Sequence, residues 1–497
     1  MDELVLGIDI GTGSTKGVLA TPDGTVVATA VRAHEGAMVM PRPDRAEMDA
    51  EAVWWADVVA ICRELVDPAR PVAAVCVSGL GPCLLLTTAD GTPVRPAILY
   101  GIDGRATAEI AELDERLGAD AVLRRCGTPL TTQAVGPKAL WVQRHEPEAW
   151  ARAERWFSAG SYAAFRLSGE YVLDHHTASQ SVPLYDLHTA DWAHDWYDEV
   201  MAGLPAPTLA WSGEVVGAVT AAAADETGLP VGTPVCAGTV DAWAEAYGAG
   251  VRAPGDLMLM YGSTMFFVQE LRSPAPHPQL WNTRGVTPAG FSLAAGMSTS
   301  GSLTTWVRDL VGGPPFEDLV REAGAVPPGS DGLLLLPYLV GERTPIFDTR
   351  ARGVLVGLTL RHRRGHLFRA AYEGIAFGIR QILELLDSPE NPVERLVAVG
   401  GGTQGGLWTQ VVSDVTGRPQ HLPRQTIGAA YGDALMAAQG AGLVAPDADW
   451  ASLDRVVEPN ATHRGLYDEL YAAYTSLHPA TREHQHLLAD LQAGPGS

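Results

Sequence analysis

The sequence predicts a mixed α/β fold, and three features of the 497-residue chain lead to that prediction. Short apolar strands alternate with segments whose apolar residues recur at helical spacing. The Pro-Asp-Gly and Ala-Asp-Gly turns at residues 22–24 and 89–91 join neighbouring strands, which suits antiparallel hairpins and is rare in a purely parallel sheet. Each half of the chain opens with a strand, a turn rich in Gly, Ser or Thr, and a second strand, so we expect a duplicated architecture.

The elements of the first half follow from these patterns in order. Residues 3–11 and 15–33 predict three strands, of which the last two are joined by the turn at 22–24. Residues 49–65 carry apolar side chains at helical spacing and predict a helix. Residues 72–94 then repeat the order of strand, glycine-rich break, strand and turn. The first half is therefore expected to combine hairpins with helices.

A break in composition near residues 245–256 separates the two halves. A helix ends there, and the chain passes through Gly and Pro before a new strand–turn–strand segment begins. We place the domain boundary at this break, which gives domains of residues 1–247 and 248–497. Residues 364–388 of the second half predict a long helix, followed by a strand and a glycine-rich loop.

The composition excludes several classes of partner. A net charge of −23 argues against nucleic acid and anionic membranes, because both repel an acidic protein. The longest apolar stretches are shorter than the ~20 residues that a membrane helix requires, and no basic segment precedes an apolar one at the amino terminus. The five cysteines form no C-x-x-C pair, which indicates reduced core thiols and a cytoplasmic protein.

The stretch GIDIGTGSTKG, Gly7–Gly17, combines bare backbone with hydroxyls, one acid and one lysine. Glycine turns expose backbone amides that hold anionic oxygens, and Thr12, Ser14 and Lys16 add further donors. Asp9 beside a phosphate requires an intervening cation, so the pattern implies Mg²⁺. The spacing is not that of a Walker A loop. An ordinary Gly-rich β-turn with a solvated aspartate is an equal interpretation of this stretch taken alone.

A second stretch places Asp241 at the junction of a strand and a helix. In PVCAGTVDAWAEAYGAG, residues 234–250, an apolar strand ends at Gly238 and Thr239, and a helix of small residues follows. A carboxylate at such a junction can accept a proton from a substrate hydroxyl during phosphoryl transfer. An aspartate that caps the helix is the commoner explanation, and both roles can coexist in one residue.

Two more glycine-containing turns follow apolar strands in the second half. Gly262, Ser263 and Thr264 form a small hydroxyl-bearing turn, as if one phosphate chain were held from both halves. Residues 400–402 are three glycines between a strand and a helix, where a flat nucleobase could lie against bare backbone. Each loop alone is also explained by connection geometry. Together with two separate aspartates, the three loops indicate a nucleotide site.

These segments resemble the FGGY family of carbohydrate kinases and occur in that family's order. The resemblance also rests on the long block GERTPIFDTRARGVLVGLTLRHRRGHLFRAAYEGIAFGIRQ at residues 341–381. Further matches, RPAILYGIDGRA, GPKALWVQRHEPEAW and VGGGTQGGLWTQVVSDVTG, extend it over residues 5–440. The resemblance implies an actin/Hsp70-like fold, in which two ribonuclease-H-like domains flank a catalytic cleft with the sugar toward the first domain and the nucleotide toward the second.

The resemblance also implies roles for single residues. Asp241 becomes the general base that faces the sugar hydroxyl, and Asp9 becomes a ligand of the Mg²⁺ site. The other expected site residues form two phosphate turns, an adenosine loop and an acceptor pocket. They are Gly11, Thr12, Gly13, Ser14 and Lys16; Gly262, Ser263 and Thr264; Gly401, Gly402, Gln404 and Gly405; and Tyr100, Asp103, Gly81 and Pro82.

Within the family the pattern is most similar to xylulokinases, with one departure. Xylulokinases carry a Met-His pair where this chain has Gly81 and Pro82, so no imidazole faces the sugar there. Tyr100 and Asp103 can still stack on and hydrogen-bond a small polyol or ketose. Asp103 would alternatively cap a helix over residues 105–117.

We therefore expect an ATP- and Mg²⁺-dependent kinase that phosphorylates a hydroxyl of a small sugar, with a pentulose as the first choice. Ribulose, gluconate, tetritols, pentitols and hexuloses are alternative acceptors within the same family. An actin-like ATPase switch that needs only the phosphate turns is the alternative from another class, and Asp103 and Asp241 argue against it. The expected partner is the small sugar, and a homodimer is a further expectation.

Overall fold

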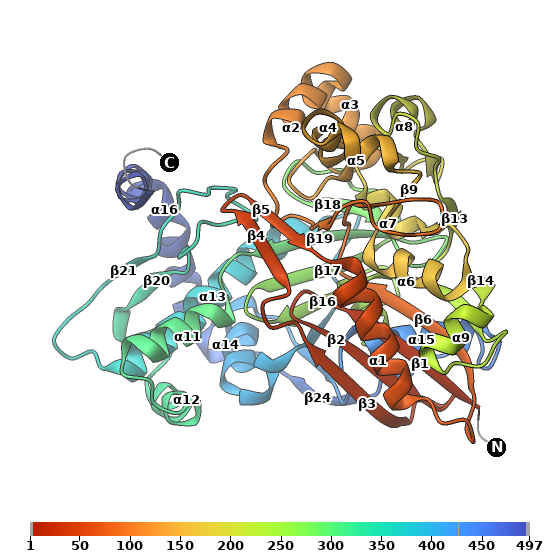
Figure 1. Ribbon diagram of the computed structural model, residues 1–497. Coiled ribbons are helices and arrows are strands. Elements are labelled where there is room, and N and C mark those ends of the chain that lie inside the picture. The colour runs from red at the N-terminus through yellow and green to blue at the C-terminus, as the bar shows by residue number, and fades with distance from the viewer. Residues whose placement is uncertain (1–2, 426, 494–497) are drawn as a thin grey trace. The chain divides into compact units, whose positions relative to one another are not determined.

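The computed structural model describes residues 3–425 and 427–493, which form two compact units (Figure 1). Unit 1 comprises residues 3–252, 271–292 and 427–450. Unit 2 comprises residues 253–270, 293–425 and 451–493. The units interleave along the chain, because two segments that follow the expected boundary fold with the first half.

Unit 1 is built on a six-stranded sheet in the order β14-β15-β6-β1-β2-β3. β1 pairs antiparallel with β2 and parallel with β6, and β6 pairs parallel with β15. The three parallel strands β1, β6 and β15 therefore end at the same edge of the sheet. The bounds are Leu4–Ile10 (β1), Ser14–Ala20 (β2), Val26–Ala33 (β3), Val72–Gly79 (β6), Val215–Ala218 (β14) and Pro234–Val240 (β15).

Different helices cover the two faces of this sheet. α1 (Ala56–Leu65) packs on β2 and β3, as Figure 1 shows, and α6 (Ala159–Ser168) packs on β6 and β15. α15 (Ala429–Gly440) packs on β1 and β6 from the opposite face. The alternation of side chains along β6 separates these faces, since Ser78 contacts α15 while its neighbour Gly79 lies against α6.

Glycines allow α15 to approach both β1 and α10 (Asp241–Gly248) very closely. A Cβ atom on Gly7 would lie 2.0 Å from the carbonyl oxygen of Ala430, and one on Gly432 would lie 1.9 Å from that of Ala244. Both distances are far below van der Waals contact, so only glycine fits at either position. This packing carries the buried side chain of Asp433 to the sheet.

A second apolar core of unit 1 includes Trp156, Tyr185 and Leu140. It lies among helices and short strands outside the main sheet. The remaining elements of unit 1 are β4 (Met38–Arg42), β5 (Arg45–Met48), π-helical turns at Ala50–Trp55 and Asp114–Gly118, β7 (Leu85–Thr87), β8 (Ala97–Ile98), α2 (Thr107–Leu113), α3 (Ala119–Cys126), α4 (Val135–His145), α5 (Pro147–Arg152), β9 (Arg155–Phe157), β10 (Val172–Asp174), α7 (His175–Gln180), β11 (Tyr185–Asp186), β12 (Asp191–Trp192), α8 (His194–Val200), β13 (Thr208–Ala210), α9 (Ala221–Thr227) and β18 (Trp281–Arg284).

Unit 2 repeats the strand arrangement of unit 1. Its sheet contains β19, β17, β16, β22, β23 and β24 in that order. β16 pairs antiparallel with β17 and parallel with β22, and β22 pairs parallel with β23, the same succession of directions as in unit 1. The expected duplication is confirmed at the level of strand topology. The strands are β16 (Asp256–Tyr261), β17 (Met265–Leu271), β19 (Phe291–Met297), β20 (Leu334–Leu336), β21 (Val354–Val356), β22 (Arg395–Val399), β23 (Gln420–Pro423) and β24 (Leu453–Val457).

The helices of unit 2 include the long one that the sequence predicts. α13 spans Arg364–Leu386 and is buried along most of its length. The others are α11 (Gly301–Leu310), α12 (Phe316–Ala325), α14 (Leu407–Thr416), α16 (Arg464–Ala493) and short 3₁₀ turns at Ser330–Gly332, Gly401–Gly405 and Ala461–His463.

Two structural findings bear on the expectations from composition. All five cysteines are buried and unpaired, as expected of reduced core thiols. Within residues 3–425 and 427–493, no helix is both long and apolar enough to cross a membrane.

Candidate active site

The first predicted phosphate turn is the tight connection between β1 and β2. The Gly11 amide donates to the Ser14 carbonyl oxygen at 3.0 Å, which closes the turn. Gly13 is exposed, and a Cβ atom there would meet nothing within 4 Å. The Thr12 hydroxyl lies 2.6 Å from the Tyr100 hydroxyl, so a predicted phosphate residue touches a predicted acceptor residue. The turn thus presents open backbone beside hydroxyl groups.

Asp9 and Lys16 face each other across this hairpin. They are directly paired in the antiparallel register, so their side chains lie on the same face of the sheet. Asp9 is buried, and its Oδ1 atom has no hydrogen-bond partner. Burial, followed by the negative charge of Asp241, holds the pKa of Asp9 well above its usual value, and Lys16 opposes that shift. An orphaned carboxylate oxygen of this kind is rare and suits a bound cation.

Asp241 is the first residue of α10, directly after β15. The cap of this helix is Val240, so the structure does not support the interpretation of Asp241 as the N-cap. Its Oδ1 atom accepts a hydrogen bond from the Ala242 amide at 2.7 Å. Burial raises the pKa of Asp241, whereas the Ala242 amide and the Lys16 ammonium lower it. Because the charge of Asp241 acts on Asp9, the two predicted carboxylates lie in one part of unit 1.

Two further carboxylates, which the sequence analysis did not identify, lie near Asp9 and Asp241. Glu245 lies one turn after Asp241 on α10, and burial raises its pKa to about 7, with Lys16 opposing the shift. Asp433 on α15 accepts a hydrogen bond from the Ser78 hydroxyl at 2.6 Å. Burial, and more weakly Asp9 and Asp241, hold the pKa of Asp433 well above its usual value. A single acid inside the apolar segment AAYGDALMAA was the available signal for Asp433.

This carboxylate cluster has the chemistry that Mg²⁺ requires. Within residues 3–425 and 427–493, no three His, Cys, Asp or Glu side chains are arranged to hold a metal ion by themselves. Magnesium usually takes one or two carboxylates and completes its shell with water and phosphate oxygens. The free Oδ1 atom of Asp9 meets that requirement. The residues present therefore fit a metal ion that arrives with a phosphate.

The predicted acceptor residues lie beside this turn, and some of them are already hydrogen-bonded within the protein. Gly81 and Pro82 are buried just beyond β6, at the same sheet edge as Gly11 and Asp241. Asp103 is buried, and its oxygens accept hydrogen bonds from the Arg105 guanidinium at 2.7 to 3.0 Å and from the Ala46 amide at 2.7 Å.

These bonds engage both oxygens of Asp103 within the protein. The helix cap expected of Asp103 is not observed, because α2 begins at Thr107 with Ala106 as its cap. Its contact with the acceptor stays a prediction.

Lys138 is a buried cation that the sequence analysis passed over. It lies in the first turn of α4, is 1% exposed, and its Nζ atom has no hydrogen-bond partner. Burial lowers the pKa of its ammonium group to about 8, with Cys83 and Asp103 acting in the opposite direction. Lys138 therefore lies among the predicted acceptor residues.

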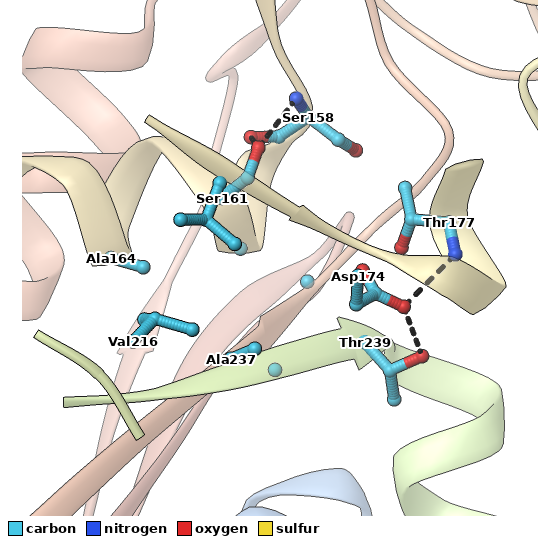
Figure 2. Close-up of a pocket in the computed structure, with 12 residues that line it drawn as sticks. Ser158, Ser161, Ala164, Asp174, Thr177, Val216, Ala237 and Thr239 are labelled. Carbon is cyan, nitrogen blue, oxygen red and sulfur yellow. Dashed lines mark hydrogen bonds between the residues drawn. The ribbon is translucent and has the colours of Figure 1, made fainter. Parts of the chain in front are cut away.

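A pocket of unit 1 lies behind the end of β15 rather than at the predicted site residues (Figure 2). Its cavity volume is only about 10 Å³, and small side chains of β6, α6 and β15 contribute to its lining. Asp174 accepts hydrogen bonds there from the Thr177 amide at 2.9 Å and the Thr239 hydroxyl at 3.1 Å, as Figure 2 shows. These bonds tie α7 to β15 two residues before Asp241. Asp241 does not line the pocket, but these hydrogen bonds hold the end of the strand that leads to Asp241.

In unit 2, the predicted second phosphate turn connects β16 and β17. Ser263 and Thr264 are exposed, and the Gly262 amide donates to the Thr264 carbonyl oxygen at 3.1 Å. The first turn of α11 anchors this turn through backbone hydrogen bonds. The Gly301 amide donates to the Gly262 carbonyl oxygen at 2.9 Å, and the Ser302 amide donates to the Ser263 carbonyl oxygen at 3.1 Å. The turn is thereby anchored through its backbone, and its two hydroxyl-bearing side chains are exposed.

The predicted adenosine loop leaves β22 at the same sheet edge, since β22 runs parallel to β16. Gly401, Gln404 and Gly405 are exposed, and a Cβ atom on either glycine would meet nothing within 4 Å. Gly402 lies instead against Trp408, where a Cβ atom would come within 2.6 Å of the ring. The loop thus exposes backbone without side chains, and the Trp408 ring packs against it.

The sequence of the chain matches two family models. Residues 4–248 match the N-terminal domain of the FGGY family of carbohydrate kinases, and residues 257–441 match its C-terminal domain. The chain belongs to the FGGY family. An FGGY relative, the xylulose kinase of Streptomyces coelicolor (strain ATCC BAA-471 / A3(2) / M145), is 34% identical over 460 residues, which cover 89% of this chain and 88% of that protein.

Other FGGY relatives match over nearly the full length. The xylulose kinase of Bacillus subtilis (strain 168) is 28% identical over 96% of this chain and 97% of that protein. The crystal structure of xylulose kinase from Rhodospirillum rubrum is similar with a TM-score of 0.88 and 32% identity, over 97% of this chain and 100% of that one. The chain is thus a carbohydrate kinase with the actin/Hsp70-like two-domain ATPase fold.

Proposed function

We propose that this FGGY kinase transfers the γ-phosphoryl group of ATP to a hydroxyl of a pentulose. The substrate class follows the relatives, which are named xylulose kinases. The observation that carries the chemistry is that β1 and β15 both run parallel to β6, so that Asp9, just before the Gly11–Gly13 turn, and Asp241, directly after β15, lie at the same edge of the sheet. This edge combines a carboxylate able to take a proton with one whose free oxygen suits a metal ion.

Asp241 acts as the general base in this reaction. It accepts the proton of the sugar hydroxyl as that oxygen attacks the γ-phosphorus, and ADP leaves. The Ala242 amide orients the carboxylate, and burial raises its pKa, which makes it a stronger base. The amides of Gly11–Gly13 and the Lys16 ammonium bind phosphate oxygens. Mg²⁺ bound through Asp9 would neutralise charge on the phosphates.

We assign nucleotide binding in unit 2 to its two open loops. The exposed hydroxyls of Ser263 and Thr264 would contact phosphate, and Gly401, Gly402, Gln404 and Gly405 would border the adenosine. The support for this assignment is the bare, exposed backbone of both loops at one edge of one sheet. The predicted domains 1–247 and 248–497 would then bind mainly sugar and mainly nucleotide, respectively.

The acceptor pocket departs from the xylulokinase pattern at one point. Gly81 and Pro82 stand where xylulokinases carry a Met-His pair, so ribulose, gluconate, a tetritol, a pentitol or a hexulose would replace xylulose as the natural substrate if the missing imidazole is decisive. The proposed partners are the sugar and ATP, without nucleic acid or membrane. A homodimer and a cytoplasmic location complete the proposal.

The variant Asp241→Asn tests the base. We expect it to retain MgATP affinity and to lose at least about 100-fold in kcat, because general-base catalysis typically contributes that much or more. The matched control is Asp120→Asn, which removes an exposed carboxylate from α3. A turnover near that of the wild type in Asp241→Asn would exclude the residue from this role.

A coupled assay of ADP release identifies the acceptor. Pentuloses, hexuloses, tetritols, pentitols, glycerol and gluconate are each supplied with MgATP, and we expect a pentulose to give the highest kcat/KM. A preference for another acceptor would move the proposal within the family. ATP hydrolysis that no sugar stimulates would instead favour an actin-like ATPase switch.

A further inference from the structure

Behind the Gly11–Gly13 turn lies a histidine that the proposed mechanism does not use. His34 follows β3, and its side chain is 2% exposed. Its backbone amide donates to the Gly13 carbonyl oxygen at 2.9 Å. Both the backbone and the ring of His34 therefore support the turn.

The ring of His34 has an acceptor at each nitrogen. Nδ1 lies 3.2 Å from the carbonyl oxygen of Thr12, and Nε2 lies 2.8 Å from Oδ2 of Asp57. Nε2 also lies 3.0 Å from the Thr15 hydroxyl, which can adapt to either role. A carbonyl oxygen and a carboxylate oxygen only accept, so both ring nitrogens must carry protons for both contacts to be hydrogen bonds. The geometry therefore suits a ring that donates from both nitrogens.

The charged groups around His34 are consistent with this state. Asp57 on α1 supplies the negative charge at Nε2. Arg32 on β3 is paired with Glu64 of α1 at 2.5 Å and so does not compete for Asp57. Thr15 on β2 contacts the ring through its hydroxyl, and the next residue, Lys16, points to the opposite face of the sheet. One carboxylate thus balances one imidazolium under the turn.

We propose that the His34–Asp57 pair is a positioning device that holds the carbonyl of Thr12 and thereby keeps the amides of the first turn directed at phosphate. The proposal rests on the proposed function, in which this turn binds ATP phosphate. Thr12 is then held at two points, its carbonyl by His34 and its hydroxyl by Tyr100. Removal of the ring would release the carbonyl of Thr12 from one of these two points.

The test measures MgATP affinity by calorimetry for the wild type and for His34→Gln at the same pH. We expect His34→Gln to bind MgATP about three- to tenfold more weakly, the equivalent of one hydrogen bond. Asp57→Asn should weaken binding in the same direction, because it removes the acceptor that holds the ring at Nε2. The control His145→Gln, at an exposed histidine, should behave as the wild type.

A direct readout keeps the proposal falsifiable if His34→Gln fails to fold. Long-range ¹H–¹⁵N spectra of the histidine-labelled full chain report the protons on each ring, and the signal that Asp57→Asn shifts identifies His34. We expect a proton on Nδ1, the nitrogen that faces the Thr12 carbonyl oxygen. Absence of that proton, or equal MgATP affinity in the wild type and in His34→Gln, would overturn the positioning role. Absence of MgATP binding in the wild type would overturn the proposed function itself.

A separate observation concerns Lys138. The chain contains 35 basic residues, and the printed sequence has lysine only at positions 16 and 138. Arginine serves as the cation everywhere else. Lys138 is buried without a hydrogen-bond partner, near the carboxylate of Asp103 that Arg105 already engages. An unpaired buried ammonium destabilises a fold, so its retention points to a ligand that completes it.

We infer that Lys138 is a specificity-determining residue that donates to an oxygen of the sugar acceptor. Its Nζ atom has no hydrogen-bond partner within residues 3–425 and 427–493, and its charge acts on Cys83, next to Pro82. The inference also rests on the proposed function, because it places the acceptor beside Asp103 and Pro82. A carboxylate of a sugar acid and a hydroxyl of a ketose are both suitable partners for the ammonium.

Lys138→Met separates recognition from structure. With D-xylulose, D-ribulose and gluconate as acceptors, we expect KM for the acceptor to rise about tenfold or more while KM for ATP is unchanged, and the thermal midpoint to rise. The largest loss with gluconate would identify a carboxylate as the group that Lys138 binds. An unchanged acceptor KM together with a lower thermal midpoint would show a structural lysine and overturn the inference. Lack of turnover of all three acceptors by the wild type would count against the proposed substrate class instead.

Discussion

Lys138 also makes the stability of unit 1 depend on pH. Burial lowers the pKa of its ammonium from 10.5 to about 8 in the folded protein, so the unfolded chain binds this proton more tightly. Stability therefore rises with pH between about 8 and 10.5, and the full burial cost of about 3 kcal/mol is present below pH 8. We expect the stability difference between wild type and Lys138→Met, measured by urea unfolding, to change by that amount across this window. A difference that does not vary with pH would show that the ammonium has a partner in the folded state.

Single residues of the site were predictable from sequence where a motif and a strand end coincide. Asp9, the Gly11–Gly13 turn and Asp241 each follow this rule, and the structure brings them together in unit 1. Asp433 was not predicted as a member of the carboxylate cluster, because its position depends on the packing of α15 on β1, which no local sequence pattern encodes. The hydrogen bond from the Ala46 amide to Asp103 was not predicted for the same reason, since Ala46 is distant in sequence.

At the scale of elements, the β1–β2 hairpin separates glycines needed for the fold from those needed for function. Gly7→Ala places a methyl group 2.0 Å from a backbone oxygen of α15, so we expect a loss of about 3 kcal/mol or more in unfolding free energy. Gly13→Ala meets nothing within 4 Å and should leave stability within about 0.5 kcal/mol. It should weaken MgATP binding about tenfold by obstructing one phosphate hydrogen bond. Denaturant unfolding and calorimetry measure the two effects.

The opposite result for either glycine would contradict this assignment. A stable Gly7→Ala protein would mean that α15 does not pack as described, and undiminished MgATP affinity in Gly13→Ala would remove the turn from the phosphate site. The hairpins themselves were predictable from turn residues and alternating apolar strands, and α13 from helical spacing over its length. The close approach of α15 was not, because an apolar helix does not specify which sheet it covers.

At the scale of the whole molecule, the sheets of both units share an antiparallel first pair of strands followed by the same succession of parallel strands. Each contributes a hairpin turn between its first two antiparallel strands, Gly11–Gly13 in unit 1 and residues 262–264 in unit 2. The repeated start of each half made this duplication visible in the sequence. The interleaving of residues 271–292 and 427–450 with unit 1 was not visible, since it depends on contacts between segments far apart in the chain.

The most direct test of the central claim is ³¹P NMR spectroscopy of the full chain with MgATP and D-xylulose. The account predicts that ADP and a sugar phosphate monoester accumulate in equal amounts, and that Asp241→Asn forms neither at a comparable rate. Inorganic phosphate as the product, formed equally with and without sugar, would contradict it.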